Sequence, residues 1–240
     1  MSELSNDPVM SGGPEPFFKI WIKALTKPSE QTFAGLAASP NAKATTGYLW
    51  YFIAALVQIF FVTLVPNESL RQLLEQYGSQ YGAQFPVSGG FVSNLVSAIC
   101  GAPIGALIGT LLFALGVALI QWIAKMFGGR GTNDQLVYAL SAIVSPFALV
   151  NAVLSLLGAI PYVGFCFGLV SILAGLYILV LEVMAVKGVN QFGWGQALGS
   201  FFIPVLAFAC LCACLVGGTI ALLGSVLGET FRQIQQGLGQ

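Results

Sequence analysis

Residues 135–181 read QLVYALSAIVSPFALVNAVLSLLGAIPYVGFCFGLVSILAGLYILVL, without one Asp, Glu, Lys or Arg. A helix needs about 20 consecutive apolar residues to cross a bilayer, and this run is long enough for two. The segment Ile160-Pro161-Tyr162-Val163-Gly164 divides it near its middle. A connection that short forces the two helices to be antiparallel neighbours. The run therefore predicts a transmembrane hairpin, and with it an integral membrane protein.

The composition of the whole chain leads to the same class. Hydrophobic residues make up 57% and charged residues 8%, whereas soluble domains carry roughly 25% charged residues. The formal net charge is zero, which argues against a nucleic-acid partner. The chain has no His, so a large share of catalytic and metal-site chemistry is excluded. All five Cys lie in apolar runs, which argues against a disulfide framework.

The pattern of apolar runs predicts an all-α fold, a polytopic bundle of five transmembrane helices. The predicted spans are residues 47–65, 99–124, 136–159, 163–186 and 198–227. Residues 1–16 are expected to be a disordered tail and residues 228–240 a short polar tail. In the loop after the first span, apolar residues over 70–81 fall on one helical face, which predicts a surface helix there.

An amphipathic segment, residues 17–46, precedes the first span. Its apolar residues recur at helical spacing: Phe17, Ile20, Trp21, Ala24 and Leu25. Lys19, Lys23 and Lys27 lie off that stripe. One interpretation is a helix in the membrane interface, whose three lysines contact lipid headgroups. The other is a helix packed on the surface of the protein itself, and the pattern does not decide between them.

Glycines predict where the helices pack closely. Gly101, Gly105 and Gly109 form a small-xxx-small row in the second span, and Gly164, Gly168 and Gly175 lie in the fourth. Such residues let two helix backbones approach each other. Pro103 is expected to bend the first turns of the second span. A flexible gate at Pro103 is the alternative, and close packing is the interpretation that we favour.

Few polar side chains are available inside the predicted spans. Glu182 is the only acidic residue in any of them, and Asn151 lies in the third span. Glu182 either takes part in an ion pathway or reaches the interface and pairs with Lys187, which we favour. The Cys210-x-Cys212-x-Cys214 run does not predict a metal site, because residues two apart on a helix point to opposite sides.

Three segments carry a resemblance to a known family. They are Leu25-Thr26-Lys27-Pro28-Ser29-Glu30-Gln31-Thr32-Phe33; Gly128-Gly129-Arg130-Gly131-Thr132 followed by Gln135-Leu136-Val137-Tyr138-Ala139-Leu140 and Ser145-Pro146; and the corner Ile160-Pro161-Tyr162-Val163-Gly164. Together they resemble the Yip (Ypt-interacting protein) domain family, and the first is similar to the entry segment of its prokaryotic members. The resemblance implies a five-helix membrane bundle.

In eukaryotic members, the resemblance also implies contacts with Rab-type GTPases and a role in vesicle traffic or membrane shaping. That branch carries an Asp-Leu-x-Gly-Pro segment ahead of the first span. Here Ser39-Pro40-Asn41-Ala42-Lys43 stands in its place. A GTPase partner is therefore not carried over, and the chain looks more like a bacterial or archaeal member.

The residues of the chain are compatible with three function classes to different degrees. An enzyme is the weakest, because a triad or zinc site lacks His and Glu182 has no second acid beside it. We expect no catalytic residues, no cofactor and no metal. A transporter or channel with Glu182 and Asn151 in its pathway is the alternative. The favoured class is a non-enzymatic membrane scaffold, organising or trafficking-like protein that acts through helix packing. Its expected partners are the lipid bilayer, other membrane proteins or further copies of the chain.

The distribution of Lys and Arg predicts the orientation. With five spans, one side carries Lys19, Lys23, Lys27, Lys43, Lys125, Arg130 and Lys187, and the other carries Arg71 and Arg232. Because cytoplasmic loops are enriched in Lys and Arg, the N-terminus is predicted to be cytoplasmic and the C-terminus extracytoplasmic. The membrane is then the plasma or inner membrane of the cell.

Reporter fusions test this topology. A reporter fused after Gln240 is expected on the extracytoplasmic side, and a reporter inserted at Gly131 on the cytoplasmic side, because five spans separate the two termini. Accessibility of each reporter in intact cells is the measurement. Both reporters on one face would contradict the five-span arrangement.

Overall fold

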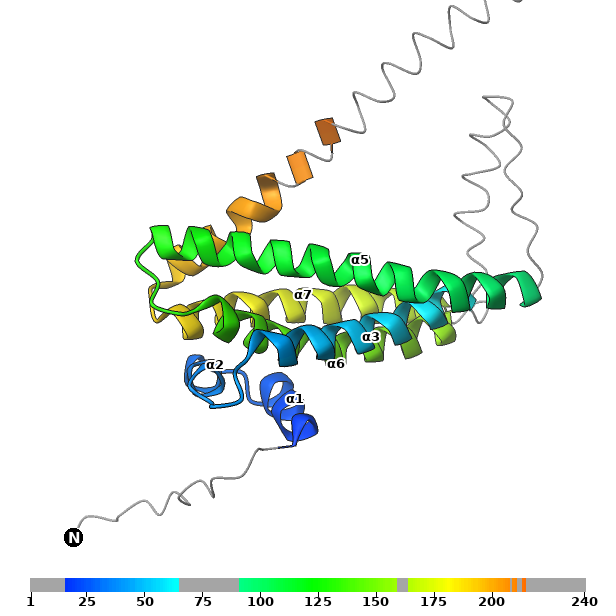
Figure 1. Cartoon of the computed structure of the whole chain (residues 1–240), viewed down its shortest axis with the longest axis horizontal. Helices are drawn as coiled ribbons and strands as arrows, with labels where there is room; N and C mark the ends of the chain where they lie inside the picture. Colours follow the sequence, from blue (N-terminus) through cyan, green and yellow to red (C-terminus); the bar gives the residue numbers. More distant parts are fainter. Residues whose placement is uncertain (1–15, 65–90, 159–163, 208, 211–212, 215–240) are drawn as a thin grey trace, which may run out of the picture.

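The computed structural model describes residues 16–64, 91–158 and 164–207, with short helical pieces at 209–210 and 213–214. Four helices in it are long and apolar enough to cross a membrane: α3 (Ala44–Leu64), α5 (Phe91–Met126), α6 (Asn133–Gly158) and α7 (Gly164–Asn190). Two short helices precede them, α1 (Phe17–Thr26) and α2 (Glu30–Ala37), and an apolar helix over Trp194–Ala207 follows (Figure 1). The predicted class, a helical polytopic membrane bundle, is confirmed.

Several predicted features lie outside the described residues. They are the tail over 1–15, the surface helix over 70–81, the corner over 160–163, most of the fifth span beyond residue 207, and the tail over 228–240.

All four long helices extend beyond the predicted spans, α3 and α6 by three residues at their starts and α5 and α7 by more. α5 begins at Phe91 rather than near Ile99, so Pro103 lies in its interior and not in its first turns. α7 continues past Val186 to Asn190. Hydropathy predicts where a chain is apolar enough for the bilayer, whereas a helix also continues through polar residues when their side chains find partners. Lys187 has two such partners, the carboxylate of Glu30 and the ring of Trp194.

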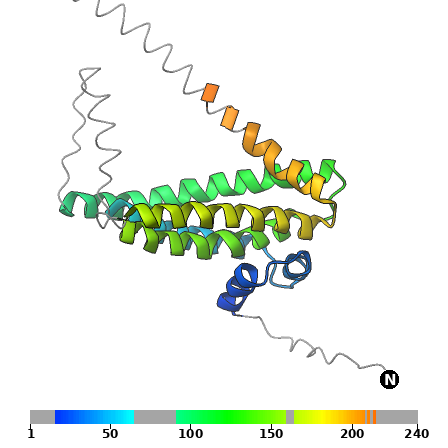
Figure 2. The ribbon, with the colours of Figure 1, turned by 180° about the vertical axis from the view of Figure 1, so that it is seen from behind.

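The long helices form a bundle around α3, which packs against both α5 and α6, while α7 packs on α6. The four helices run side by side, as Figures 1 and 2 show from opposite sides of the molecule. Gly47 allows the closest approach of α3 to α6: a Cβ there would lie 2.8 Å from Ser141 Oγ and 2.9 Å from Val137 Cγ1. On the α5 side, the ring of Tyr51 stacks on Phe113 with the centroids 4.3 Å apart.

The outer surface of α5 is apolar. In its middle turns, over 104–115, six large hydrophobic side chains are more than half exposed: Ile104, Leu107, Ile108, Leu111, Leu112 and Leu115. A patch of this kind is a liability on a soluble protein. In a bilayer the surrounding lipid is as apolar as Leu, so this surface suits a helix that faces lipid.

α1 docks on the bundle through its apolar stripe. Ile20, Trp21 and Ala24 are buried, and the ring of Trp21 meets Trp50 of α3 edge-on, with centroids 5.9 Å apart. Tyr177 Oη of α7 donates a hydrogen bond of 2.7 Å to the Leu25 carbonyl. The buried part of the stripe therefore packs on the protein itself, as the second of the two interpretations has it.

The predicted glycine faces differ in what they meet. A Cβ at Gly105 would lie 3.1 Å from Ile59 Cδ1 of α3, and one at Gly109 would lie 3.8 Å from Tyr51 Oη. Among the described residues, nothing lies within 4 Å of a Cβ at Gly101, Gly168 or Gly175. A packing role for these three and for Gly164 stays a prediction.

Replacing Gly105 by Leu is expected to separate α5 from α3, because the added side chain must displace Ile59. Gly105→Leu should therefore lower the thermal unfolding midpoint in detergent more than Gly116→Leu, since a Cβ at Gly116 meets open space. Overpacking costs roughly 1–3 kcal/mol. Equal midpoints for the two variants would mean that Gly105 does not mark a helix interface.

Candidate functional site

The polar groups of the bundle gather at one end, which we call the loop end. It holds the loop 127–132, the last turn of α7, α2 and the start of α6. The loop begins as a glycine cap on α5: Gly129 N donates to Ala124 O at 2.8 Å and Gly128 N donates to Lys125 O at 3.0 Å. This pair of bonds is a Schellman motif, whose turning residue needs a left-handed backbone. Gly128 supplies it, with φ 86°.

A reciprocal pair of amides lies beneath this loop. Gln121 of α5 and Asn190 at the end of α7 are 3% and 0% exposed. Gln121 Nε2 donates to Asn190 Oδ1 at 2.9 Å, and Asn190 Nδ2 donates to Gln121 Oε1 at 3.2 Å. Gln121 Nε2 also donates to the Gly131 carbonyl at 2.6 Å, and Asn190 Nδ2 to the Val186 carbonyl at 3.1 Å. Every side-chain polar atom of the pair therefore has a partner, as a buried amide requires.

The end of α7, with Asn190 of this pair, explains two glycines of the loop. A Cβ at Gly129 would lie 2.6 Å from Asn190 Oδ1, and a Cβ at Gly131 would lie 2.6 Å from Val189 Cγ1. No side chain fits at either position without displacing α7. Because Gly131 is enclosed, a topology reporter is better placed at the exposed Gly128.

The loop also completes the ends of two helices. Arg130 N donates to the Asn190 carbonyl at 3.1 Å, which satisfies one of the carbonyls that a helix leaves free at its C-terminus. At the start of α6, Thr132 N donates to Gln135 Oε1 at 2.9 Å and Gln135 N donates to Thr132 Oγ1 at 3.3 Å. This exchange is a capping box, the usual device for fixing a helix N-terminus.

α2 packs across the last turns of α7. Ser29 caps it, its Oγ accepting a hydrogen bond from Thr32 N at 3.0 Å, and Phe33 is fully buried. Gly188 of α7 permits the contact, since a Cβ there would lie 2.7 Å from the Glu30 carbonyl.

Lys187 fixes the position of α2 by charge. Its Nζ forms an ion pair with Glu30 and also lies 4.3 Å from the ring centroid of Trp194. A cation this close to the face of Trp is attracted by the ring. Lys187 therefore joins α2, α7 and the helix over Trp194–Ala207.

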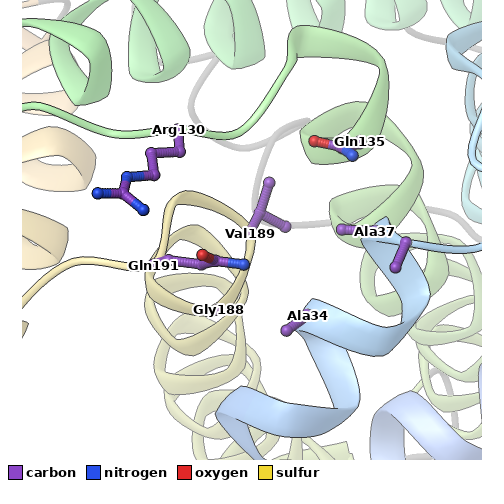
Figure 3. A pocket seen from close by; sticks show the side chains of 8 residues that line it. Ala34, Ala37, Arg130, Gln135, Gly188, Val189 and Gln191 are labelled. Carbon is purple, nitrogen blue, oxygen red and sulfur yellow. The ribbon is translucent and has the colours of Figure 1, made fainter.

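Between α2 and the end of α7 lies a hollow, which we call the loop-end groove. Its narrower part has a volume of about 150 Å³. The residues lining it are Ala34, Ala37, Ala38, Arg130, Gln135, Gly188, Val189 and Gln191. Figure 3 shows Arg130 and Gln191 at one edge, with Ala34 and Ala37 of α2 across from them.

A wider part, of about 500 Å³, adjoins the first, because Ala34, Gly188 and Gln191 line both. It also includes Glu30 and Lys187.

The two polar residues predicted for the spans lie apart. In the antiparallel pair of α6 and α7, Asn151 is seven residues from Gly158 and Glu182 is eighteen residues from Gly164. The difference of eleven residues corresponds to ~16 Å along the axis at ~1.5 Å per residue. The Asn151 and Glu182 side chains are therefore too far apart to belong to one site.

Glu182 does not make the predicted contact with Lys187 among the described residues, since Lys187 pairs with Glu30. Residues five apart on a helix do not share a face, which accounts for the difference. Glu182 is half-buried and lies within electrostatic range of Tyr51 on α3. Glu182 is eight residues from Asn190, which places it ~12 Å from the end of α7. It therefore lies further from the helix end than the predicted span, which ended at residue 186, had implied.

Of the three lysines predicted to contact lipid headgroups, Lys19 and Lys27 are exposed and Lys23 is half-buried. That contact stays a prediction.

Within the part of the chain that the structure describes, no three His, Cys, Asp or Glu side chains come together as metal ligands. Cys210 and Cys214 are free thiols, and Cys212 lies outside the described residues.

The residues that organise the loop end, Gln121 and Asn190, were not singled out from the sequence. A signal existed: Gln121 is an amide inside a predicted span, and such a group needs a partner in the membrane. Asn190, just past the end of another span, is a candidate at the same level of the membrane.

Breaking the amide pair is expected to destabilise the bundle. Gln121→Ala leaves Asn190 Oδ1 and the Gly131 carbonyl without their donor, at a cost of about 1–3 kcal/mol for a buried unsatisfied group. Thermal unfolding in detergent measures the loss. Asn151→Ala is the matched control, since Asn151 has no hydrogen bond from its side chain within the described residues. A Gln121→Ala midpoint equal to that of the control would contradict the structural role of the pair.

Comparison with known proteins adds one finding. No curated protein and no solved structure matches the chain. The Yip1 domain matches residues 22–217, a range that begins in α1, includes every long helix described above and extends past the helix over Trp194–Ala207. The chain therefore belongs to the Yip1 domain family.

Proposed function

We propose that the protein is a non-enzymatic scaffold of the membrane, which organises lipid or membrane-protein partners through its helix faces and its loop end. The observation that carries this proposal is a contrast between the two parts of the bundle. At the loop end, the buried amides and the Lys187–Glu30 pair are used to hold the fold together. Along the helices, α5 and α7 present Gly101 and Gly168, beside which no atom of the described residues lies within 4 Å of a Cβ.

Open glycine positions suit association with another helix in the membrane. Lipid provides no hydrophobic force between helices, so their association depends on close packing at small residues. Gly168 is exposed on α7, beside the exposed side chains of Leu169 and Val170. A helix of a partner protein or of a second copy is the occupant that we propose.

The proposed orientation places the loop end in the cytoplasm. Lys125, Arg130 and Lys187 all lie there, which agrees with the enrichment of Lys and Arg in cytoplasmic loops. We propose that α1 lies at the same interface. Its exposed Phe17 and Phe18 would enter the lipid while Lys19 contacts headgroups.

A transporter is the second candidate, and Glu182 is the observation that favours it. This acid lies within electrostatic range of Tyr51, whose hydroxyl is near Gly109 of α5. The separation of Glu182 from Asn151 speaks against a shared pathway, because a transported ion needs several ligands at one site.

Co-purification from native membranes tests the scaffold. The tagged chain should bring down a membrane protein or a second, differently tagged copy. Gly168→Leu should reduce that recovery without lowering the unfolding midpoint, because its side chain enters open space. Gly35→Leu is the matched control, since Gly35 is equally open but lies in α2. Recovery that is unchanged in Gly168→Leu, or absent in the wild type, would contradict the proposal.

A flux assay on the same preparation tests the alternative. Wild type and Glu182→Gln, reconstituted in liposomes, are expected to behave alike under a pH or cation gradient, because the scaffold moves no ion. A wild-type flux that vanishes in Glu182→Gln, with the fold intact, would favour the transporter.

A further inference from the structure

We propose that the loop-end groove binds a phosphate-bearing anion, and that its source in the cell is the headgroup of an anionic phospholipid. Inorganic phosphate offers the same chemistry from solution. The inference deepens the proposed function and rests on it, since it names the class of lipid partner. Failure of the scaffold proposal would appear as lost recovery of a partner protein, whereas failure of the anion site would appear as a lack of ligand binding. The two measurements therefore distinguish the two failures.

The charge that would recognise the anion is Arg130. Its side chain is exposed and makes no ion pair within the described residues, while its backbone N–H holds the Asn190 carbonyl. The fold therefore uses the backbone of Arg130 and leaves the guanidinium free. A planar guanidinium offers two parallel donors, which match the oxygens of a phosphate.

Two amides add donors around the narrower part of the groove. Gln135 uses Oε1 as an acceptor in the capping box, so its Nε2 remains to donate. Gln191 lies opposite α2 with φ 56°, a left-handed backbone that is uncommon for a residue other than glycine. No carboxylate is among the residues that line this part. With one guanidinium and no carboxylate, the lining suits an anion better than a cation.

The wider part of the groove favours a lipid as the source. Lys187 lies there beside Glu30, which neutralises it. Of the two cations that line the groove, Arg130 is therefore the one without an ion pair to a described residue. Phe192 also lines this part, and Trp194 follows it with an exposed ring. Trp is enriched at the level of the headgroups. An anionic lipid could thus place its phosphate beside Arg130 and its first acyl carbons beside Phe192.

Ligand-dependent stability measures the binding. The full chain, purified in an uncharged detergent at constant ionic strength, is titrated with phosphatidylglycerol, phosphatidylcholine or inorganic phosphate, and the unfolding midpoint is followed. Three variants accompany the wild type. Arg130→Gln removes the charge and keeps the backbone donor. Ala38→Glu adds a carboxylate at an exposed lining position. Lys125→Gln removes an exposed charge nearby that does not line the groove.

Phosphatidylglycerol is expected to raise the midpoint of the wild type and of Lys125→Gln alike, and phosphatidylcholine to raise neither. Arg130→Gln should need at least about ten times more phosphatidylglycerol, the factor that ~1.4 kcal/mol represents, and Ala38→Glu should lose affinity as well. A response to inorganic phosphate that is equally lost in Arg130→Gln would support the site and make solution its source.

Three results would overturn the proposal. They are a wild type that responds to neither anion, an Arg130→Gln response equal to that of the wild type, and an equal loss in Lys125→Gln, which would indicate diffuse attraction by surface charge. The unliganded midpoints distinguish loss of binding from loss of fold.

Discussion

The bundle depends on one interaction, the reciprocal hydrogen bonds between Gln121 and Asn190. An amide buried in an apolar protein is costly unless each donor and acceptor is paired, and here each side chain supplies what the other needs. The pair joins the end of α5 to the end of α7, although these two helices are not major packing partners in the bundle. Gly129 and Gly131 are glycines because the loop passes directly over Val189 and Asn190 at the end of α7.

The N-terminal segment depends on the same end of α7. Its Pro28 separates two helices, its Ser29 caps the second, and its Glu30 neutralises Lys187. These three consecutive residues therefore each have a structural role. Together these contacts create the loop-end groove, since α2 forms one wall and α7 the other.

Much of this fold was predictable, because membrane spans follow from local hydropathy. The long apolar runs predicted α3, α5, α6 and α7, although each helix exceeded its predicted bounds at one end or both, α5 the most. The end of α7 was not predictable, because it depends on contacts that residue 190 makes with the distant loop and Gln121. Lys187 shows the same limit: a local argument paired it with Glu182, whereas the fold brings Glu30 to it from the far end of the sequence.

The docking of α1 and α2 has a consequence for the order of assembly. Leu25 receives its hydrogen bond from Tyr177, and Glu30 pairs with Lys187. The N-terminal helices are synthesised first, yet their partners emerge from the ribosome only when most of the chain has been made. Until α6 is inserted, the Trp21 stripe has no complete surface to pack on, and until α7 is inserted, α2 lacks its main partner. The closure of this segment on the bundle is then a late event, which marks a chain whose four long helices are already in place.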